Sequence, residues 1–466
     1  MAAAHARAPV AGVALSPRLR LLLEGPVAPT LVRLAAPNVL VMLLQAAVAT
    51  LDAIFVGWLG SGALAGISLV FPLVMLMQTM SAGGMGGGVA SAVARALGAG
   101  RRADATALVA HALLIAVAMG ACFTAGLVVG GPAIYRAMGG TGATLDAALA
   151  YSNVLFGGAL AYWLFNTLGS VVRGTGNMAL PASVMLGNAA VYIALSPALI
   201  LGWGPFPPLG ITGAAVASVA SFTLGALALS AYLLSGRSLV SLSVRGVRLR
   251  RALFWEILRV GAPGSLNTVM TNLTVVVLTG LVGPLGPAAL AGYGMGARLE
   301  YLQIPIVFGL GSALVTMVGA NVGAGQLARA ERVAWVGGGI AAGLTGSVGL
   351  LAAVFPNAWL GMFSADPDVL DAGTRYLTVV GPVYGFFGLG LALYFASQGA
   401  GVLLWPLLAG AGRLLIAALG GWVAIHWLGG GLGALCLAIA LSFVMYGLTV
   451  AAAIRAGAWR RAVPVP

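Results

Sequence analysis

The residue of this chain best suited to chemistry is an acid inside a long apolar run. Asp52 lies within residues 31–57, a stretch long enough to cross a bilayer. A charge in hydrocarbon costs a few kcal/mol or more, and such acids usually mark a proton or ion pathway. The alternative is a carboxylate held by neighbouring helices for packing alone. We favour the pathway, with burial favouring the protonated carboxyl.

Two further polar residues share a helix face with Asp52. Asn38, Gln45 and Asp52 are spaced by seven residues, which places them on one side of a helix with a drift of about 20° per step. This stripe is expected to face a bundle interior or a wet cavity, because lipid would leave its polar groups unsatisfied. Asn38 suits an interhelical hydrogen bond, whereas for Gln45 packing and pathway are equally open.

The composition indicates which elements must position these residues. Hydrophobic residues make up 61% of the chain and charged residues 7%, against about 25% charged in soluble domains. Apolar segments of membrane-spanning length recur along the chain, so an all-α integral membrane protein is expected. Twelve spans are predicted, over 31–57, 63–93, 105–130, 146–171, 180–203, 211–235, 257–283, 288–320, 330–355, 371–397, 404–427 and 431–454.

The basic residues indicate membrane topology and not nucleic-acid binding. The net charge is +13, but the basic residues are all Arg and are spread between the spans. With both termini in the cytoplasm, only Arg136 and Arg375 fall outside, as the positive-inside rule requires. Cys122 and Cys436 lie in apolar spans, and the three His show no ligand spacing. No metal and no cofactor are therefore expected.

The chain consists of two similar halves. "RLAAP" at 33–37 matches "RVGAP" at 259–263, and Tyr151 and Tyr376 match at a shift of 225. These are two of six matches in register, which together indicate a duplication. Because each half has an even number of spans, both halves enter the membrane in the same direction, and the repeats are parallel. The expected parts are a cytoplasmic tail at 1–30, an N-lobe at 31–235, a basic connector at 236–256, a C-lobe at 257–454 and a C-terminal tail at 455–466.

The duplication provides an internal control for Asp52. Shifted by 226 residues, Asp52 corresponds to Leu278 and Gln45 corresponds to Thr271. If the acid were needed to hold this type of helix together, the second half should carry one as well. The carboxylate is therefore expected to serve something that only the N-lobe does.

A second group of charges is predicted inside the C-lobe. Arg298 and Glu300 are two residues apart in one span, so they point in different directions. They should meet different partners or line a wet cavity with Gln303. Arg413 is a buried guanidinium with no acid within a helical turn. A structural charge network is favoured for this group, and a substrate role remains open, as it does for Asn38.

Five segments, taken in order, resemble the MATE (multidrug and toxic compound extrusion) transporters over about residues 25–455. The resemblance implies two six-helix lobes in a V around a central cavity, in a monomer of the prokaryotic plasma membrane. It implies no enzyme, but export of amphipathic, often cationic compounds coupled to inward H⁺ or Na⁺. The segments are "LDAIFVGWLGSGALAG" (51–66), "GGGVASAVARALGAGRRADA" (86–105), "SVVRGTGNMALP" (170–181), "GSALVTMVGANVGAGQLARAERV" (311–333) and "FASQGAGVLLWP" (395–406).

The resemblance also implies that Asp52 is a cation-coupling residue. Many members carry Asn-x-x-x-Asp-Pro in the fifth span, where this chain has "YIALSP" with Ser196 in place of the acid. The missing second carboxylate favours H⁺, with Na⁺ as the alternative. Helices 7 and 10 lack the acids of the NorM-like branch, so the chain is closer to the DinF-like branch. The expected polar neighbours of Asp52 are Gln45, Tyr151, Asn166, Asn188, Ser196 and Ser218.

Two other functions fit the sequence less well. A flippase for a lipid-linked precursor, from the wider superfamily, would favour a cavity rich in Arg, for which Arg298 and Arg413 are thin support. A membrane-embedded enzyme would need clustered His, Cys or paired carboxylates, and the chain shows no such cluster. "GMGGGVAS" lacks the Lys of a Walker motif, so ATP is not expected to drive transport.

Overall fold

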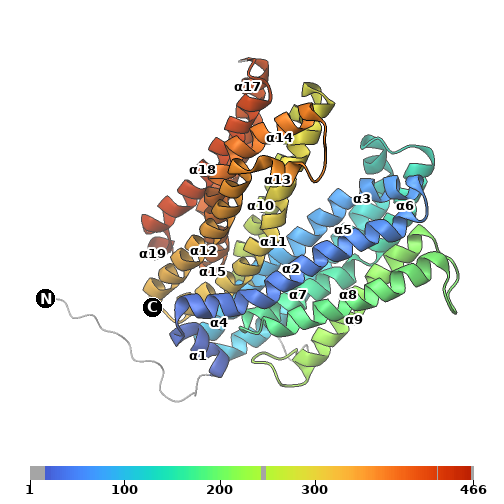
Figure 1. Cartoon of the computed structure of the whole chain (residues 1–466). Coiled ribbons are helices and arrows are strands. Elements are labelled where there is room, and N and C mark those ends of the chain that lie inside the picture. The colour runs from blue at the N-terminus through green and yellow to red at the C-terminus, as the bar shows by residue number, and fades with distance from the viewer. Residues whose placement is uncertain (1–15, 243–247, 428, 463–466) are drawn as a thin grey trace.

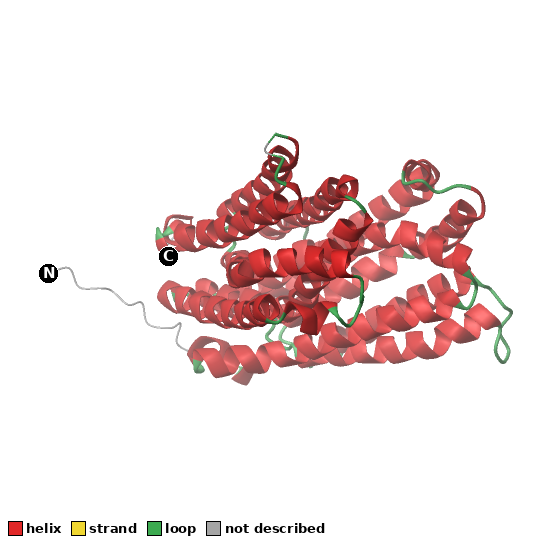
Figure 2. Ribbon diagram, turned by 45° about the horizontal axis from the view of Figure 1, so that its top comes forward, coloured by secondary structure: helices red, strands yellow, loops and turns green. Residues whose placement is uncertain are grey.

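All elements of the described structure are helices, as Figure 2 shows. The computed structural model describes residues 16–242, 248–427 and 429–462, and the side chains of several residues of α2, Asp52 among them, lie outside that description. The longer helices are α2 (Val27–Gly57), α3 (Ser61–Thr79), α4 (Gly86–Gly98), α5 (Arg102–Ala137), α6 (Gly142–Gly157), α7 (Ala159–Gly174), α8 (Ala179–Leu201), α9 (Ile211–Leu234), α10 (Arg251–Val282), α11 (Pro287–Gly323), α12 (Leu327–Val354), α14 (Pro367–Val380), α15 (Tyr384–Ala400), α16 (Leu404–Leu415) and α18 (Gly431–Arg455).

Short elements join or extend these helices. A π-helical segment, η1 (Met80–Met85), links α3 to α4, and a second, η4 (Ile416–Gly420), links α16 to α17 (Gly421–His426). Single 3₁₀ turns, η2 (Gly283–Leu285) and η3 (Gly381–Val383), follow α10 and α14. The remaining short helices are α1 (Pro17–Glu24), α13 (Pro356–Leu360) and α19 (Ala458–Ala462).

The predicted membrane spans are confirmed in number and order. Eleven helical segments of the described chain are long and apolar enough to cross a membrane, and the bent pair α6–α7, with a 48° break, makes twelve. The helices extend past two of the predicted domain boundaries. α10 begins at Arg251, inside the expected connector at 236–256, because Arg250 already lies at its N-cap. α1 and the start of α2 lie inside the expected tail at 1–30.

The helices form two groups that lean away from each other, as Figure 1 shows. In this view α3, α5, α6, α8 and α9 extend to one side, and α10, α12, α14 and α18 extend to the other. The groups converge at the end of the molecule where α1, α4 and α19 lie. Two apolar cores reflect this division, one centred on α11–α18 and one on α4–α9. We refer to α2–α9 as the N-terminal half and to α10–α18 as the C-terminal half.

Glycine allows the two halves to meet backbone to backbone along α4. A methyl group on Gly98 would lie 2.0 Å from the carbonyl oxygen of Ala320, and one on Gly84 would lie 2.6 Å from the nitrogen of Ser265. Small residues permit such close helix contacts. Polar contacts complete the junction, with the Ser91 hydroxyl donating to the carbonyl of Gln398 at 2.5 Å.

Helix positions follow the repeat found in the sequence. α6 and α14 begin at residues 142 and 367, and α8 and α16 begin at residues 179 and 404. Both pairs are separated by 225 residues. α2 and α10 each contain an internal proline, Pro37 and Pro263, at the shift of 226. Positions in one half can therefore be compared with positions in the other.

Candidate functional site

One face of α2 packs against α8 and α9. Val48 joins a small apolar cluster with Tyr192 of α8 and Ala217 of α9. Gln45, which is half-buried, lies three residues before Val48, so by helix register it belongs to the same face. Position 52 lies one helical turn after Val48. The side chain of Asp52 is outside the described part, so its contacts stay a prediction.

The predicted neighbours of Asp52 come from α6, α7, α8 and α9. Tyr151, Asn166, Asn188 and Ser196 are buried, and Ser218 is half-buried. The Asn166 amide donates to the carbonyl of Tyr162 in its own helix at 3.1 Å. Its hydrogen bond is therefore local, and its place beside Asp52 stays a prediction.

Two polar groups of α8 are buried without a hydrogen-bond partner among the described residues. They are the Asn188 amide nitrogen and the Ser196 hydroxyl. Gly225 of α9 makes room for Asn188, because a methyl group there would lie 2.3 Å from the amide nitrogen. Buried polar groups normally have a partner, so these two groups have capacity for a further ligand or water.

In the C-terminal half, a buried ion pair lies in a small cavity. A carboxylate oxygen of Glu300 lies 3.6 Å from an Arg413 guanidinium nitrogen, and the Tyr376 hydroxyl donates to the other oxygen at 3.3 Å. The cavity, of about 10 Å³, is also lined by Thr274 and Leu278 of α10. The acid partner of Arg413 therefore comes from α11, a distant part of the sequence.

Arg413 is also surrounded by aromatic rings. Its guanidinium carbon lies 4.7 Å from the ring centre of Phe387, 5.0 Å from that of Phe443 and 6.0 Å from that of Tyr446. The electron-rich faces of such rings attract a cation. We call Phe387, Phe443 and Tyr446 the aromatic cage.

The other predicted C-lobe residues are not part of this cavity. Arg298 is exposed, which corrects its assignment to a buried set, and its guanidinium lies 5.7 Å from the Phe363 ring. Arg298 and Glu300 thus meet different partners, as their spacing predicted. The buried Gln303 donates to the carbonyl of Leu299 at 3.2 Å. In the N-terminal half, Asn38 of α2 is also buried, and its amide nitrogen has no partner among the described residues.

The C-terminal cavity contains the repeat counterparts of the predicted N-terminal site. Leu278 corresponds to Asp52, and Tyr376 corresponds to Tyr151. Arg413 corresponds to Asn188 at the shift of 225 that relates α16 to α8. The C-terminal half therefore brings these three positions together around one cavity, and its acid comes from α11.

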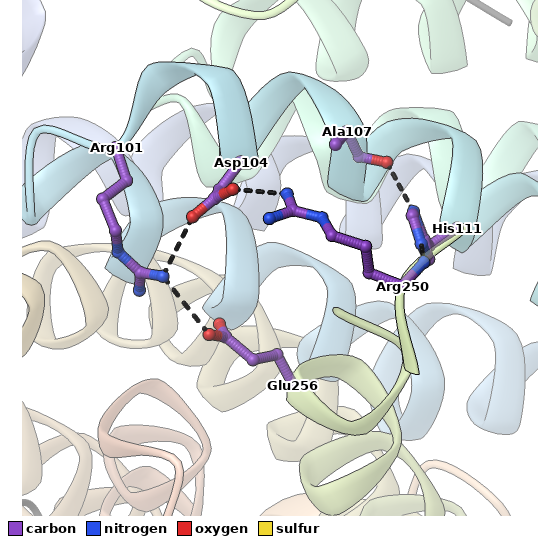
Figure 3. A network of polar contacts seen from close by, with 6 residues as sticks. All are labelled: Arg101, Asp104, Ala107, His111, Arg250 and Glu256. Carbon is purple, nitrogen blue, oxygen red and sulfur yellow. Dashed lines mark hydrogen bonds and ion pairs between the residues drawn. The ribbon is translucent and has the colours of Figure 1, made fainter. Parts of the chain in front are cut away.

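A charged network between α5 and the start of α10 was missed by the sequence prediction. As Figure 3 shows, Arg101 pairs with Asp104 at 3.2 Å and with Glu256 at 3.5 Å, and the Arg250 side chain also binds Asp104. By helical spacing alone, Glu256 could equally have paired with Arg259, one turn along the same helix. The clustering of Arg near Asp104 in sequence was the available signal. This α5–α10 network joins the two halves near their junction.

A buried histidine supports the same junction. The backbone amide of Arg250 donates to Nε2 of His111 at 2.9 Å, and Nδ1 lies 2.8 Å from the carbonyl of Ala107. These contacts assign the proton of the neutral imidazole to Nδ1. His111 thereby holds Arg250, the residue just before α10, against α5.

A second small cavity lies where the two halves meet. Its lining includes Gly83 and Gly87 from η1 and α4, Arg173 from α7, Phe308 from α11, and Gln398 from α15. Of its lining residues, Arg173 is the one that carries a charge. In the described ranges, no group of three or more His, Cys, Asp or Glu side chains could hold a metal ion.

Comparison with known proteins identifies the family. The MatE family model matches residues 37–198 and 263–423, and its second match starts 226 residues after the first. The chain is 29% identical over 378 residues to a FAD transporter of Shewanella oneidensis, covering 81% of this chain and 82% of that one. It is 28% identical over 360 residues to the probable multidrug resistance protein YoeA of Bacillus subtilis, covering 75% and 76%.

A solved structure agrees with the fold. A MOP superfamily transporter from Pyrococcus furiosus superposes with a TM-score of 0.87 at 23% identity, covering 96% of this chain and 100% of that one. The helical architecture with up to twelve spans and the family match in both halves agree with one another. The chain therefore belongs to the MATE family: it is a multi-pass membrane transporter and not an enzyme.

Proposed function

We propose that this transporter exports amphipathic, often cationic organic compounds in exchange for protons, and that Asp52 is the carboxyl that takes up the proton. The family supports export of organic compounds, and the relative from Bacillus subtilis is named as a probable multidrug resistance protein. Asp52 supplies the intramembrane acid that such coupling needs.

The C-terminal cavity is the observation that carries this proposal. It places the counterparts of Asp52, Tyr151 and Asn188 around one small cavity that contains a carboxylate. The repeat relation then favours a matching cluster around Asp52, between α2, α6 and α8. In that cluster Tyr151 would stand toward Asp52 as Tyr376 stands toward Glu300.

The surroundings of Asp52 favour H⁺ over Na⁺. The expected neighbours Gln45, Asn166, Asn188, Ser196 and Ser218 are all uncharged. Of the acids whose side chains are described, only Glu300, in the C-terminal half, is buried. The described acids of the N-terminal half therefore offer no second buried carboxylate. A single carboxyl can load and release a proton, whereas a hard cation prefers several oxygen ligands. Amide and hydroxyl oxygens could still complete a Na⁺ site, which is the alternative.

The mechanism requires two states of the halves. If protonation favours one state and substrate binding favours the other, the proton gradient drives the cycle in one direction. The α4 junction, where the halves touch backbone to backbone, is where such a change of state would pivot. We place both termini in the cytoplasm, treat the two halves as lobes of a monomer and assign the chain to the DinF-like branch.

Transport by reconstituted protein tests the proposal. Wild-type protein in liposomes should export an organic cation when a pH gradient is imposed, and Asp52→Asn should abolish that export while the protein stays folded. Asp146→Asn, at an exposed acid of α6, is the matched control and should behave like wild type. Export that follows a Na⁺ gradient at clamped pH would reject the proton, and normal export by Asp52→Asn would reject the site.

A second substrate class is supported by the cavity between the halves. One relative is named a FAD transporter, and the charge lining this cavity is the guanidinium of Arg173, near the rings of Phe308 and Phe395. A guanidinium with adjacent aromatic rings suits an anionic aromatic compound such as a flavin nucleotide. Liposomes loaded with FAD or with a cationic dye distinguish the two classes. FAD export that is lost in Arg173→Gln would favour the nucleotide.

A further inference from the structure

Glu300 is a buried acid whose charge is only partly compensated. Its residue surface is 9% exposed. Its nearest guanidinium nitrogen, on Arg413, lies at 3.6 Å, and the Tyr376 hydroxyl lies at 3.3 Å. Both distances are longer than those of good hydrogen bonds to a carboxylate. A buried ion pair needs close geometry to offset the loss of hydration, and this pair does not have it.

Arg413 has compensation that does not depend on Glu300. The aromatic cage contacts its guanidinium from three rings, at 4.7, 5.0 and 6.0 Å. Its Nε has no hydrogen-bond partner among the described residues, and the residue is 7% exposed. The cage can therefore hold the positive charge if the carboxylate becomes neutral.

Glu300 lies beside a cavity that has room for a proton-donating water molecule. The adjacent cavity, of about 10 Å³, has room for about one water molecule. Its α10 side contributes Thr274 and Leu278, which do not titrate. The titratable groups that interact with Glu300 are Tyr293 and Tyr301 of its own helix α11, Tyr376 of α14, Tyr384 of α15 and Arg413 of α16, while Cys436 of α18 interacts with Tyr293 and Tyr384.

We propose that Glu300 is a second proton-binding carboxyl, and that Arg413 passes from the carboxylate to the aromatic cage when the proton binds. The proton adds to a carboxylate oxygen, Glu300 becomes neutral, and the site changes from zero net charge to one positive charge on Arg413. Loss of the proton restores the ion pair. The use of this site in export rests on the proposed function, but proton binding itself does not.

Infrared difference spectroscopy of the full-length protein in lipid nanodiscs tests the inference. A pH titration should show the C=O stretch of a protonated carboxyl that disappears in Glu300→Gln and persists in Asp52→Asn. A wild-type spectrum without that signal, or one that Glu300→Gln leaves unchanged, would overturn the inference. If no signal is assigned to Asp52, the proposed function fails while the assignment of Glu300 stands.

A gentler variant keeps the inference testable if Glu300→Gln does not fold. Tyr376→Phe removes the one hydroxyl donor to the carboxylate, so the Glu300 signal should appear at a higher pH than in wild type. Tyr162→Phe, at a buried tyrosine of α7 in the other half, is the matched control and should leave the midpoint unchanged. An unchanged midpoint in Tyr376→Phe would show that the titrating carboxyl is not Glu300, which would overturn the inference.

Discussion

The two halves of this transporter share an architecture but differ in the source of their membrane-embedded acid. In the N-terminal half the acid is Asp52 on α2, and its α10 counterpart is Leu278. In the C-terminal half the acid is Glu300 on α11, which lies in the cavity that Leu278 lines. In the C-terminal half the carboxylate is thus supplied by α11 and not by the helix equivalent to α2.

The partners of the two acids differ in the same way. Glu300 faces a guanidinium, Arg413, whereas the position equivalent to Arg413 in the N-terminal half is the neutral Asn188. A neutral amide does not hold a carboxylate in its charged form as a guanidinium does. The N-terminal acid should therefore exchange its proton more readily than the C-terminal acid, which agrees with Asp52 as the principal coupling residue.

Moving the acid between the halves is the change with the largest expected effect. In the double variant Asp52→Leu, Leu278→Asp, export driven by a pH gradient should fall to the level of protein-free liposomes. The new acid would lie beside Glu300 and Arg413, away from the N-terminal cluster. Proteoliposome efflux measures this effect, with Asp52→Leu alone as the reference. Restored export in the double variant would show that the two sites are interchangeable.

Breaking the C-terminal ion pair should have a large effect on stability. Arg413→Leu leaves the Glu300 carboxylate buried without a counter-charge, and the expected loss is about 3–5 kcal/mol of unfolding free energy. The double variant Glu300→Leu, Arg413→Leu removes both charges and should recover most of that loss. Thermal unfolding in detergent at neutral pH measures both variants. A single variant as stable as wild type would mean that Glu300 is already neutral at that pH.

A methyl group at the junction of the halves should have an intermediate effect. Gly98→Ala would place its Cβ 2.0 Å from the carbonyl oxygen of Ala320, and overpacking of this kind costs about 1–3 kcal/mol. Gly343→Ala, in α12, has open space around its Cβ and should be neutral or stabilise by up to about 1 kcal/mol. Equal unfolding temperatures for the two variants would show that the junction yields easily.

The α5–α10 network should contribute least. Asp104→Asn removes ion pairs to Arg101 and Arg250, whose side chains are 47% and 50% exposed. Exposed pairs are worth about 0–1 kcal/mol and are weakened by salt. The expected loss of stability is therefore small and should shrink further in high salt. A loss above about 2 kcal/mol that salt does not change would show that the network acts as a buried structural unit.

Local patterns accounted for much of the architecture before any contact was known. Apolar runs of membrane length predicted the spans, because backbone hydrogen bonds in lipid can be satisfied within each helix. The register between Tyr151 and Tyr376 predicted the duplication, and the matching starts of α6 and α14 agree with it. α10 begins at Arg251, inside the predicted connector, because helix ends are weakly encoded by composition.

By itself the sequence determined the class of the protein, the number and order of its spans, its repeat and the position of Asp52 within a membrane-spanning helix. These are properties of local periodicity and composition. Only the tertiary structure decided which charges meet. Arg413 pairs with Glu300 on another helix, Glu256 pairs with Arg101 and not with Arg259, and Arg298 is exposed. Helical spacing gives the direction of a side chain relative to its own helix, but the packing of helices decides what lies opposite.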